Sequence, residues 1–349
     1  MQNSTPQTKN KNLKLERIVM EVFGGCNYTC QMCPQSNPGR GANFTRKMKI
    51  SDFERVLDQI VPKYGTPQIN LEGSGEPTMA KDLDQYVKAV KKRNLKCFMY
   101  CNGARLNGKF MNSVLDAGID FIRISVIGYN KEKYNEWMNV DNFDLILSNL
   151  KEIKNYISKN NLNCKLSTYH LITDNNQIDF EINQYKKNVI DKIGLQSYIW
   201  KMHNWSGNYE NKNARFSLER KTCGRPFAPE ITIRAGGASG RTSSMVPCCQ
   251  TLGPPNEEKS ILGHLDKESF EEVYWGEKYM ELRKAHEEKR FDDIEYCKNC
   301  DFLYADQEVL VWSNDPEAKV GHMLGTREDF ILHDYIDSKK KININEKCT

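Results

Sequence analysis

The chain has 349 residues, which is long enough to bury a full hydrophobic core. Lysine and arginine number 50 against 46 aspartates and glutamates, so the net charge is only +4 and lacks the strongly basic footprint of a nucleic-acid-binding protein. No apolar run of about 18 residues is present that would span a membrane. Residues 1–14 are polar and carry no apolar signal-peptide segment, so we expect a disordered N-terminus and a cytoplasmic protein.

Cysteines are frequent, with twelve in a chain that shows no export signal. Reducing compartments keep thiols free, so we expect metal binding rather than a disulfide framework. The first group follows a predicted buried strand, Arg17–Phe23, that leads through two glycines into Cys26, Cys30 and Cys33. Three thiolates in this C-x3-C-x2-C spacing suit a soft metal or an iron–sulfur cluster, but are too few to close a zinc site. On a [4Fe–4S] cube they would leave one iron open to a small molecule.

A glycine-rich turn follows the second predicted strand. We expect a helix over 51–61 that begins with Ser51 as its cap, and then an apolar strand over 68–71. This strand ends in Glu72-Gly73-Ser74-Gly75-Glu76-Pro77. Glycines at a strand end allow a ligand to approach the backbone closely, although an ordinary turn has the same composition.

The alternation of strands and helices continues along the chain. We predict further strands at 96–101, 121–126, 163–170 and 197–200, and helices at 82–92, 108–117, 131–138, 143–157 and 180–189. Such βα units argue for a parallel sheet, and six of them are too few for a closed eight-stranded barrel. In folds of this kind the chemistry gathers at the carboxyl ends of the strands.

The cysteine loop from Cys26 to Pro34 reads CNYTCQMCP and resembles the cluster motif of the radical S-adenosylmethionine (SAM) superfamily. The resemblance implies an α/β fold with a partial (β/α)6 TIM-like barrel over 15–205. Its cluster loop would hold a [4Fe–4S] cluster through Cys26, Cys30 and Cys33. SAM would chelate the open iron and be cleaved to a 5′-deoxyadenosyl radical that abstracts hydrogen. A reduced flavodoxin- or ferredoxin-type protein would supply the electron.

Further motif matches would position SAM. The superfamily's GGEP motif is matched, with a serine in place of one glycine, by Gly73, Ser74, Gly75, Glu76 and Pro77. The family's TNG motif after the third strand is matched by Asn102. The family's SAM-contacting serine on the fourth strand is matched by Ser125. Each of the last two is equally explained as a polar residue that caps a strand end.

Two residues are candidates for catalysis. Cys101 ends the third predicted strand and would donate a hydrogen atom to a substrate radical, or it is a small core residue like Cys97 on the same face. His203 follows the sixth strand and would bind substrate or act as a base. The alternative for His203 is a ring packed against the neighbouring tryptophans and bonded to the backbone.

A second group of cysteines follows a polar linker at 206–218. Within 219–305 we assign as ligands Cys223, Cys248, Cys297 and Cys300. Cys249 is the alternative to Cys248, because adjacent residues on an extended chain point opposite ways. Four cysteines with a C-x2-C pair generally indicate structural zinc.

The sequence around these cysteines instead resembles the SPASM/twitch family of small α+β C-terminal modules, which hold auxiliary [4Fe–4S] clusters. Four ligands imply one such cluster, as in the shorter twitch version. We expect Cys348, in a C-terminal tail over 306–349, to be free.

The resemblance to twitch-type dehydrogenases implies oxidation of a small hydroxylated or amino-sugar-like substrate, with the auxiliary cluster accepting an electron. An epimerase that uses Cys101 as hydrogen donor and a peptide-modifying SPASM maturase are alternatives. A zinc-binding interaction protein without catalysis is the alternative from a different class. We expect a small-molecule substrate and no membrane or nucleic-acid partner.

Overall fold

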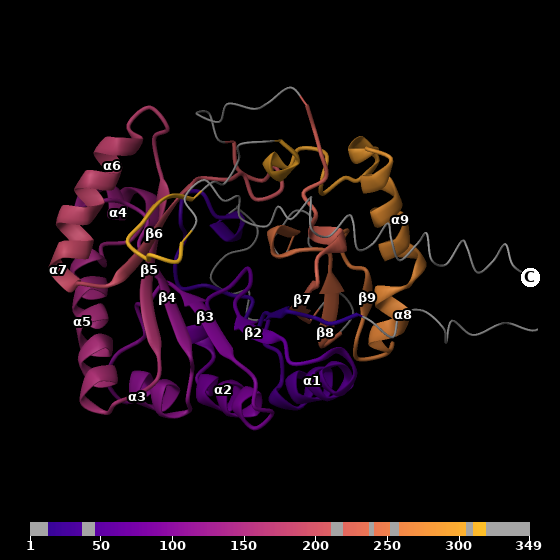
Figure 1. Cartoon of the computed structure of the whole chain (residues 1–349), viewed down its shortest axis with the longest axis horizontal. Helices are drawn as coiled ribbons and strands as arrows, with labels where there is room; N and C mark the ends of the chain where they lie inside the picture. Colours follow the sequence, from indigo (N-terminus) through magenta and orange to yellow (C-terminus); the bar gives the residue numbers. More distant parts are fainter. Residues whose placement is uncertain are drawn as a thin grey trace, which may run out of the picture.

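Six parallel strands form the middle of the sheet in the computed structural model of the chain (Figure 1). They are β1 (Arg17–Met20), β2 (Gln68–Leu71), β3 (Cys97–Cys101), β4 (Phe121–Ser125), β5 (Lys165–Ile172) and β6 (Gln196–Lys201). All six were predicted, although the first ends at Met20 rather than at Phe23. The structure describes residues 13–36, 46–210, 219–236, 241–251, 258–304 and 310–318.

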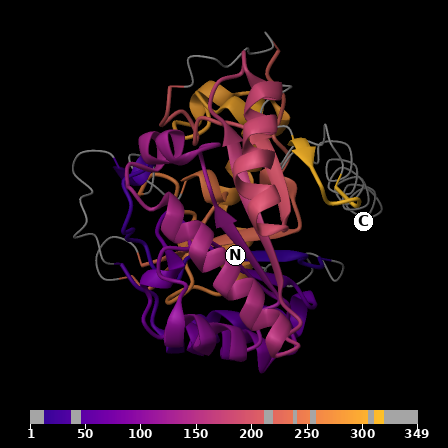
Figure 2. The same cartoon turned by 90° about the vertical axis from the view of Figure 1, so that its left-hand side faces the viewer.

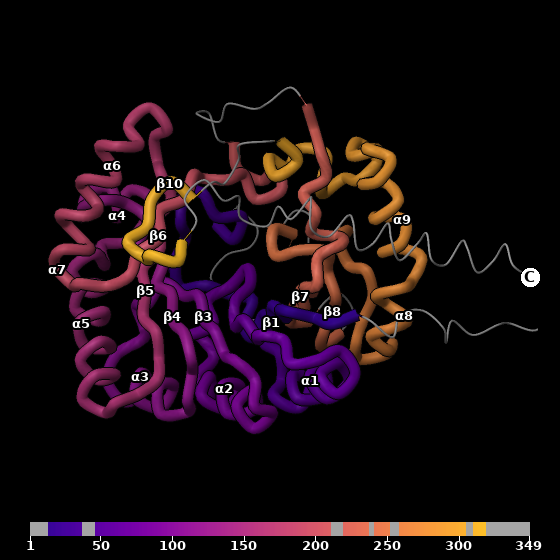
Figure 3. Tube along the Cα trace, viewed as in Figure 1, coloured from indigo at the N-terminus to yellow at the C-terminus, as the bar shows by residue number. Residues whose placement is uncertain are grey.

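The sheet extends beyond these six strands on both sides. β7 (Glu230–Ala235) pairs in parallel with β1, and β8 (Ser243–Val246) and β9 (Gly263–His264) continue the sheet in antiparallel fashion. At the other edge β10 (Leu310–Ser313) pairs antiparallel with β6, beside which Figure 3 draws it. The order is therefore β10-β6-β5-β4-β3-β2-β1-β7-β8-β9, and the C-terminal part of the chain shares one sheet with the barrel.

Helices cover the outer side of the curved sheet (Figure 1), and Figure 2, seen from the left-hand side of that view, shows barrel helices in front of the strands. In the barrel they are α1 (Ile50–Tyr64), α2 (Leu83–Lys91), α3 (Gly108–Asp116), α4 (Lys131–Met138), α5 (Phe143–Lys159), α6 (Ile178–Tyr185) and α7 (Asp191–Ile193). The C-terminal part adds α8 (Phe270–Tyr274) and α9 (Glu277–Glu287). The first unit is a βα pair like the rest, so the fold is the expected partial barrel followed by a smaller module.

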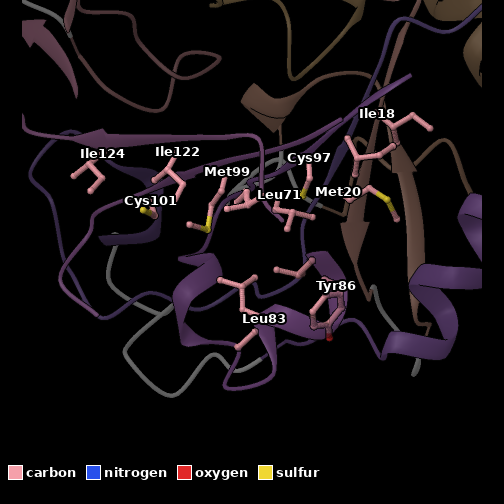
Figure 4. Close-up of a cluster of buried hydrophobic side chains, with 14 of the residues drawn as sticks. Ile18, Met20, Leu71, Leu83, Tyr86, Cys97, Met99, Cys101, Ile122 and Ile124 are labelled. Carbon is pink, nitrogen blue, oxygen red and sulfur yellow. The ribbon is translucent and has the colours of Figure 1, made fainter. Parts of the chain in front are cut away.

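The main core lies between the sheet and these helices (Figure 4). Alternate residues of each barrel strand point into it, as the burial of Cys97, Met99 and Cys101 on β3 illustrates. They pack with Leu83 and Tyr86 of α2, both fully buried. The opposite faces of the strands point into the barrel, where the polar side chains of the site gather.

Two local predictions need correction. Ser51 does not cap the first helix, because α1 begins at Ile50 and its capping residue is Lys49, with no side-chain cap bond. The helix expected over 180–189 is interrupted by a π-helical turn at Lys186–Ile190 between α6 and α7. The predictions for residues 1–12, for most of the linker, for residues 319–349 and for Cys348 lie outside the described residues. No helix in the described part of the chain is long and apolar enough to cross a membrane.

Candidate active site

The loop that carries Cys26, Cys30 and Cys33 leaves β1 through Gly24 and Gly25 and is fixed by backbone contacts. The Gly25 carbonyl accepts a hydrogen bond from the Glu76 N–H at 2.8 Å, and the Gly24 carbonyl accepts one from Gln35 Nε2 at 2.6 Å. The Gln31 N–H donates to the carbonyl of Trp137, at the end of α4, at 2.8 Å. The loop is therefore tied to the glycine turn and to the fourth βα unit.

The three thiols of this loop are partly buried and act on one another electrostatically. Burial, together with the charge of Glu76, raises the pKa of Cys26 to about 12. Burial and the neighbouring Cys33 and Cys26 raise the pKa of Cys30 well above its ordinary value. Buried thiols this close to one another lose their protons when a cation balances their charge. The set of three fits a [4Fe–4S] cluster, and no fourth protein thiol is needed for it.

The glycine turn after β2 is shaped by close backbone approach. A Cβ atom on Gly75 would lie 2.2 Å from the carbonyl oxygen of Phe23, and one on Gly73 would lie 2.5 Å from Cγ of Glu21. Glu21 in turn accepts hydrogen bonds from the backbone N–H and the hydroxyl of Ser74, at 2.8 Å and 2.6 Å. The serine that departs from the family motif thus has a buried partner in this chain.

Glu76 and Asn102 connect this turn to the end of β3. One oxygen of the buried Glu76 carboxylate accepts the Asn102 N–H at 2.7 Å, and the other accepts the N–H and hydroxyl of Thr78. The Asn102 side-chain amide donates to Oδ1 of Asn27, in the cysteine loop, at 2.8 Å. Asn102 is therefore held between the glycine turn and the cysteine loop.

A cavity of about 320 Å³ opens where these elements meet. It is bordered by most of the residues predicted for the site, namely Cys26, Cys30, Cys33, Gly73, Gly75, Glu76, Cys101, Asn102, Ser125 and His203. Ser74 borders a neighbouring space of about 180 Å³. Pro77 begins a short helical turn behind Glu76 and is buried. Residues far apart in the sequence therefore meet at one cavity.

Cys101 and His203 both border the cavity, and each has the packing that its alternative interpretation describes. The Cys101 side chain packs in the helix-facing hydrophobic layer with Ile122 and Ile124 (Figure 4). His203 Nδ1 accepts the Trp205 N–H at 3.2 Å, and the two rings are 3.8 Å apart. Burial, with the charge of Arg225, lowers the pKa of His203 to about 3. The imidazole is therefore neutral, and a base with so low a pKa is weak at neutral pH.

The second group of thiols gathers around Cys223, Cys248, Cys297 and Cys300. Burial raises the pKa of Cys297 and of Cys300, and in both cases the charges of Cys223 and Cys248 raise it further. The C-x2-C pair is brought to one side by a turn in which the Cys300 N–H donates to the Cys297 carbonyl at 2.8 Å.

Cys249 has different surroundings from Cys248. Its sulfur lies 3.3 Å from Nη1 of Arg225, and the other charges that act on it are those of Glu72, Glu230 and Arg17. Cys249 also borders the cavity, whereas Cys248 does not border it. The geometry therefore favours Cys248 as the ligand and leaves Cys249 facing the cavity.

Both thiol sets supply the kind of ligand that iron–sulfur clusters take, because each iron of a cube is bound by one cysteine thiolate. Within the described ranges, no group of three histidine, cysteine or carboxylate side chains is arranged to hold a single metal ion.

Sequence reasoning missed several residues that border the cavity. Arg225 and Gln250 come from the C-terminal part, and Glu72, Tyr100 and Arg123 from the barrel strands. The one available signal was Glu72, an acidic residue at the end of an apolar strand. The others become neighbours only after folding.

Comparisons with known proteins agree with this geometry. Residues 20–181 match the family model of the radical SAM superfamily, and residues 237–301 match that of SPASM, an iron-sulfur cluster-binding domain. A probable GTP 3',8-cyclase of Metallosphaera sedula is 23% identical over 228 residues, which cover 64% of this chain and 70% of that protein. A probable GTP 3',8-cyclase of Thermococcus kodakarensis is 29% identical over 140 residues, 40% of this chain and 43% of that protein. The second match therefore spans less than half of the relative.

Solved structures share the fold at low identity. BtrN in complex with AdoMet and 2-DOIA has a TM-score of 0.54 at 17% identity, covering 82% of this chain and 92% of BtrN. Native anSMEcpe with bound AdoMet has a TM-score of 0.53 at 14% identity, covering 94% of this chain and 99% of that protein. Streptococcus suis SuiB bound to S-adenosylmethionine has a TM-score of 0.52 at 16% identity, covering 83% of this chain and 72% of SuiB.

These domains imply SAM, a SAM-binding [4Fe–4S] cluster and an auxiliary cluster, for which the two thiol sets provide suitable donors. The chain therefore contains a domain of the radical SAM superfamily, followed toward the C-terminus by a SPASM iron–sulfur cluster-binding domain.

Proposed function

We propose that this protein is a radical SAM oxidoreductase that dehydrogenates a small hydroxylated or amino-sugar-like substrate. Cys26, Cys30 and Cys33 would hold the cluster that, when bound, supplies the electron for cleavage of SAM to a 5′-deoxyadenosyl radical. The turn Gly73–Pro77, with Asn102 and Ser125, would hold SAM beside that cluster. A reduced flavodoxin- or ferredoxin-type protein would be the electron donor.

The observation that carries this proposal is the separation of the thiols into a set of three at the cavity and a closed set of four. Cys223, Cys248, Cys297 and Cys300 would occupy every iron of a cube, so the auxiliary cluster, when bound, supplies a one-electron acceptor and no substrate position. Dehydrogenation removes one hydrogen atom and then one electron and one proton. A closed second cluster near the cavity suits that requirement.

His203 would shape the cavity wall rather than take the proton. Its imidazole is buried and neutral, and Nδ1 is engaged by the Trp205 N–H. Its tilted contact with the Trp205 ring, at 3.8 Å between ring centres, limits the movement of the imidazole. We therefore propose a positioning role for His203 in the orientation of substrate or SAM.

A peptide substrate is the runner-up hypothesis. SuiB bound to precursor peptide SuiA has a TM-score of 0.51, and anSMEcpe with bound AdoMet and Cp18Cys peptide has the same value. These values are close to that of BtrN, so fold similarity does not favour one class of substrate. The cavity of about 320 Å³ would also hold the cluster and SAM, so the space that remains suits a small substrate or a single side chain of a peptide.

Epimerisation is a second candidate reaction, because two thiols, Cys101 and Cys249, border the cavity. A hydrogen atom passed from S–H to a carbon radical leaves a thiyl radical, which one electron and one proton must restore. Of the two thiols, Cys249 is half-buried beside Arg225, whereas Cys101 packs among apolar side chains. Solvent deuterium in the product would distinguish epimerisation, which incorporates it at carbon, from dehydrogenation, which does not.

The experiment that tests the proposal is iron and sulfide analysis after anaerobic reconstitution, followed by assay of 5′-deoxyadenosine formation. We expect about eight irons per chain in the wild type and about four in the Cys26/Cys30/Cys33→Ala variant, which should form no 5′-deoxyadenosine. The Cys297/Cys300→Ala variant should retain SAM cleavage but lose oxidised product. Zinc without sulfide in the wild type, or an unchanged rate of product formation in the second variant, would contradict the proposal.

A further inference from the structure

One wall of the cavity combines an acidic side chain of the barrel with an amide side chain of the C-terminal part. Glu72 directly follows β2, and Gln250 follows β8. Both border the main cavity and the neighbouring space beside Cys33. We infer that Glu72 and Gln250 recognise the protonated amine and an adjacent hydroxyl group of an amino sugar or aminocyclitol. This inference rests on the proposed function, because it names recognition groups for the substrate of the same site.

Glu72 has an incompletely satisfied carboxylate. Its Oε1 accepts a hydrogen bond from Asn70 Nδ2 at 2.9 Å, and this is its one hydrogen bond to the described residues. Burial raises the pKa of Glu72, because the charged form has lost water without gaining enough donors. A cationic group in the cavity would compensate that loss, since charge-assisted hydrogen bonds are the stronger ones.

The arginines around Glu72 are engaged elsewhere. Arg17 donates through Nε to Glu230 at 2.9 Å and forms an ion pair with it. The Arg123 guanidinium lies 3.9 Å from the ring centre of Tyr198 and donates to Ser167 at 3.2 Å. Arg225 lies beside Cys249. These contacts engage the three guanidinium groups, and among the described residues none of them donates a hydrogen bond to Glu72, although the charges of Arg17 and Arg123 lower its pKa.

Gln250 provides the second acceptor. Its side chain is only 8% exposed, and its buried Oε1 accepts no hydrogen bond from the residues that the structure describes. Its Nε2 lies 3.7 Å from the Cys249 sulfur, which is a weak acceptor. A buried amide oxygen without a donor is unfavourable, and a ligand hydroxyl or ammonium would satisfy it. Glu72 and the Gln250 amide oxygen thus offer two acceptor positions to a donor-rich cation in a cavity whose three arginines already have partners.

The test compares glucosamine, glucose and glucose 6-phosphate as probes, with the amine protonated. Their binding to the cluster-loaded full chain in the presence of SAM is measured by anaerobic calorimetry. We expect glucosamine to bind about tenfold or more tightly than glucose, and glucose 6-phosphate to bind most weakly. In the Glu72→Gln variant glucosamine and glucose should bind alike. In the Gln250→Leu variant both should weaken while iron content stays unchanged.

The control is Glu54→Gln, which removes a carboxylate from the surface of α1, where its partner is Arg93 at 3.7 Å. This variant should keep the preference for the amine. Tightest binding of the phosphate, absence of binding by all three probes, or persistence of the preference in Glu72→Gln would overturn the inference. Weaker SAM binding in Glu72→Gln with an unchanged preference for the amine would also overturn it, because Glu72 would then contact SAM.

Formation of 5′-deoxyadenosine without any sugar is measured in the same preparations. Normal SAM cleavage with no preference for the amine would remove this inference and leave the proposed function standing. A preference for the amine without any SAM cleavage would remove the proposed function while the recognition site stands.

Discussion

The hydroxyl and the backbone N–H of Ser74 both donate to one oxygen of Glu21, at 2.6 Å and 2.8 Å. The other oxygen of Glu21 pairs with Arg46 at 3.0 Å, and the Glu21 side chain is fully buried. This carboxylate thus connects the strand before the cysteine loop to the glycine turn. We expect Glu21→Ala to destabilise the protein by about 3 kcal/mol, because it leaves a partly buried guanidinium without its partner.

Ser74→Ala is the matched, milder change, since it removes one hydrogen bond and keeps the backbone contact. We expect it to lower the free energy of unfolding by about 1 kcal/mol. Urea denaturation of the anaerobic proteins measures both effects. Equal losses in the two variants would contradict the central role assigned to Glu21.

The glycine turn gives a second prediction, on Gly75. An alanine there would bring its Cβ within 2.2 Å of the Phe23 carbonyl and 2.5 Å of the Gly25 carbonyl, both rigid backbone atoms. The cysteine loop and the turn must then separate, so we expect Gly75→Ala to abolish 5′-deoxyadenosine formation. The control is Gly108→Ala, where φ is +51° and no heavy atom lies within 4 Å of the added Cβ. It should cost about 1 kcal/mol of stability and leave SAM cleavage intact.

The adjacent thiols Cys248 and Cys249 give a third prediction. The charge of Arg225 acts on both thiols, but Cys248 also interacts with Cys223 and with the Cys297 and Cys300 pair, whereas Cys249 borders the cavity. We expect Cys248→Ala to reduce iron from about eight to about four per chain and Cys249→Ala to leave about eight. Iron and sulfide analysis of the two variants shows which cysteine binds the auxiliary cluster. The opposite result would identify Cys249 as the fourth ligand.

A fourth prediction concerns pH and His286 on α9. Burial lowers the pKa of His286 to about 4, and its Nε2 has no partner among the described residues. The unfolded chain binds this proton below a pKa of about 6.5, so the stabilisation from the neutral ring is present above about pH 6.5 and is lost as the pH falls toward 4. Between about pH 7.5 and about pH 5 we expect a loss of about 2 kcal/mol through this group.

The measurement is urea denaturation of wild type and His286→Gln at both pH values. The glutamine side chain does not titrate, so the variant should lose about 2 kcal/mol less than the wild type over the same interval. Parallel pH dependence in the two proteins would show that His286 does not report on acid unfolding.

Features that depend on neighbouring residues in the chain were predictable. The six barrel strands follow from short apolar runs, and Cys26, Cys30 and Cys33 lie in one loop, so their spacing alone indicates a shared metal site. The choice between Cys248 and Cys249 was not accessible in the same way. The side chains of adjacent residues on an extended chain point in opposite directions. Only the packing after the end of β8 determines which of the two thiols lies toward the other cysteines and which lies toward the cavity.

Long-range partners were also beyond the sequence. In the sequence Glu21 is a single polar residue at the end of an apolar run. Its partners Arg46 and Ser74 lie far along the chain, and no local pattern identifies them. Gln250 and Arg225 reach the cavity only because β7 pairs with β1, a pairing between segments more than 200 residues apart. The neutral state of His203 likewise depends on its burial in the folded protein.

The pairing of β1 with β7 also has a consequence for the order of events during synthesis. β1 emerges from the ribosome well before β7, because Glu230, the partner of Arg17, is translated 213 residues after it. Until then β1 has β2 as its neighbour on one side and an exposed edge on the other, and such edges invite association between chains. We therefore expect a nascent chain that is interrupted before β7 to aggregate. Co-expressed chaperones should raise the yield of the full chain more than they raise the yield of a protein whose strands pair only with their neighbours in the sequence.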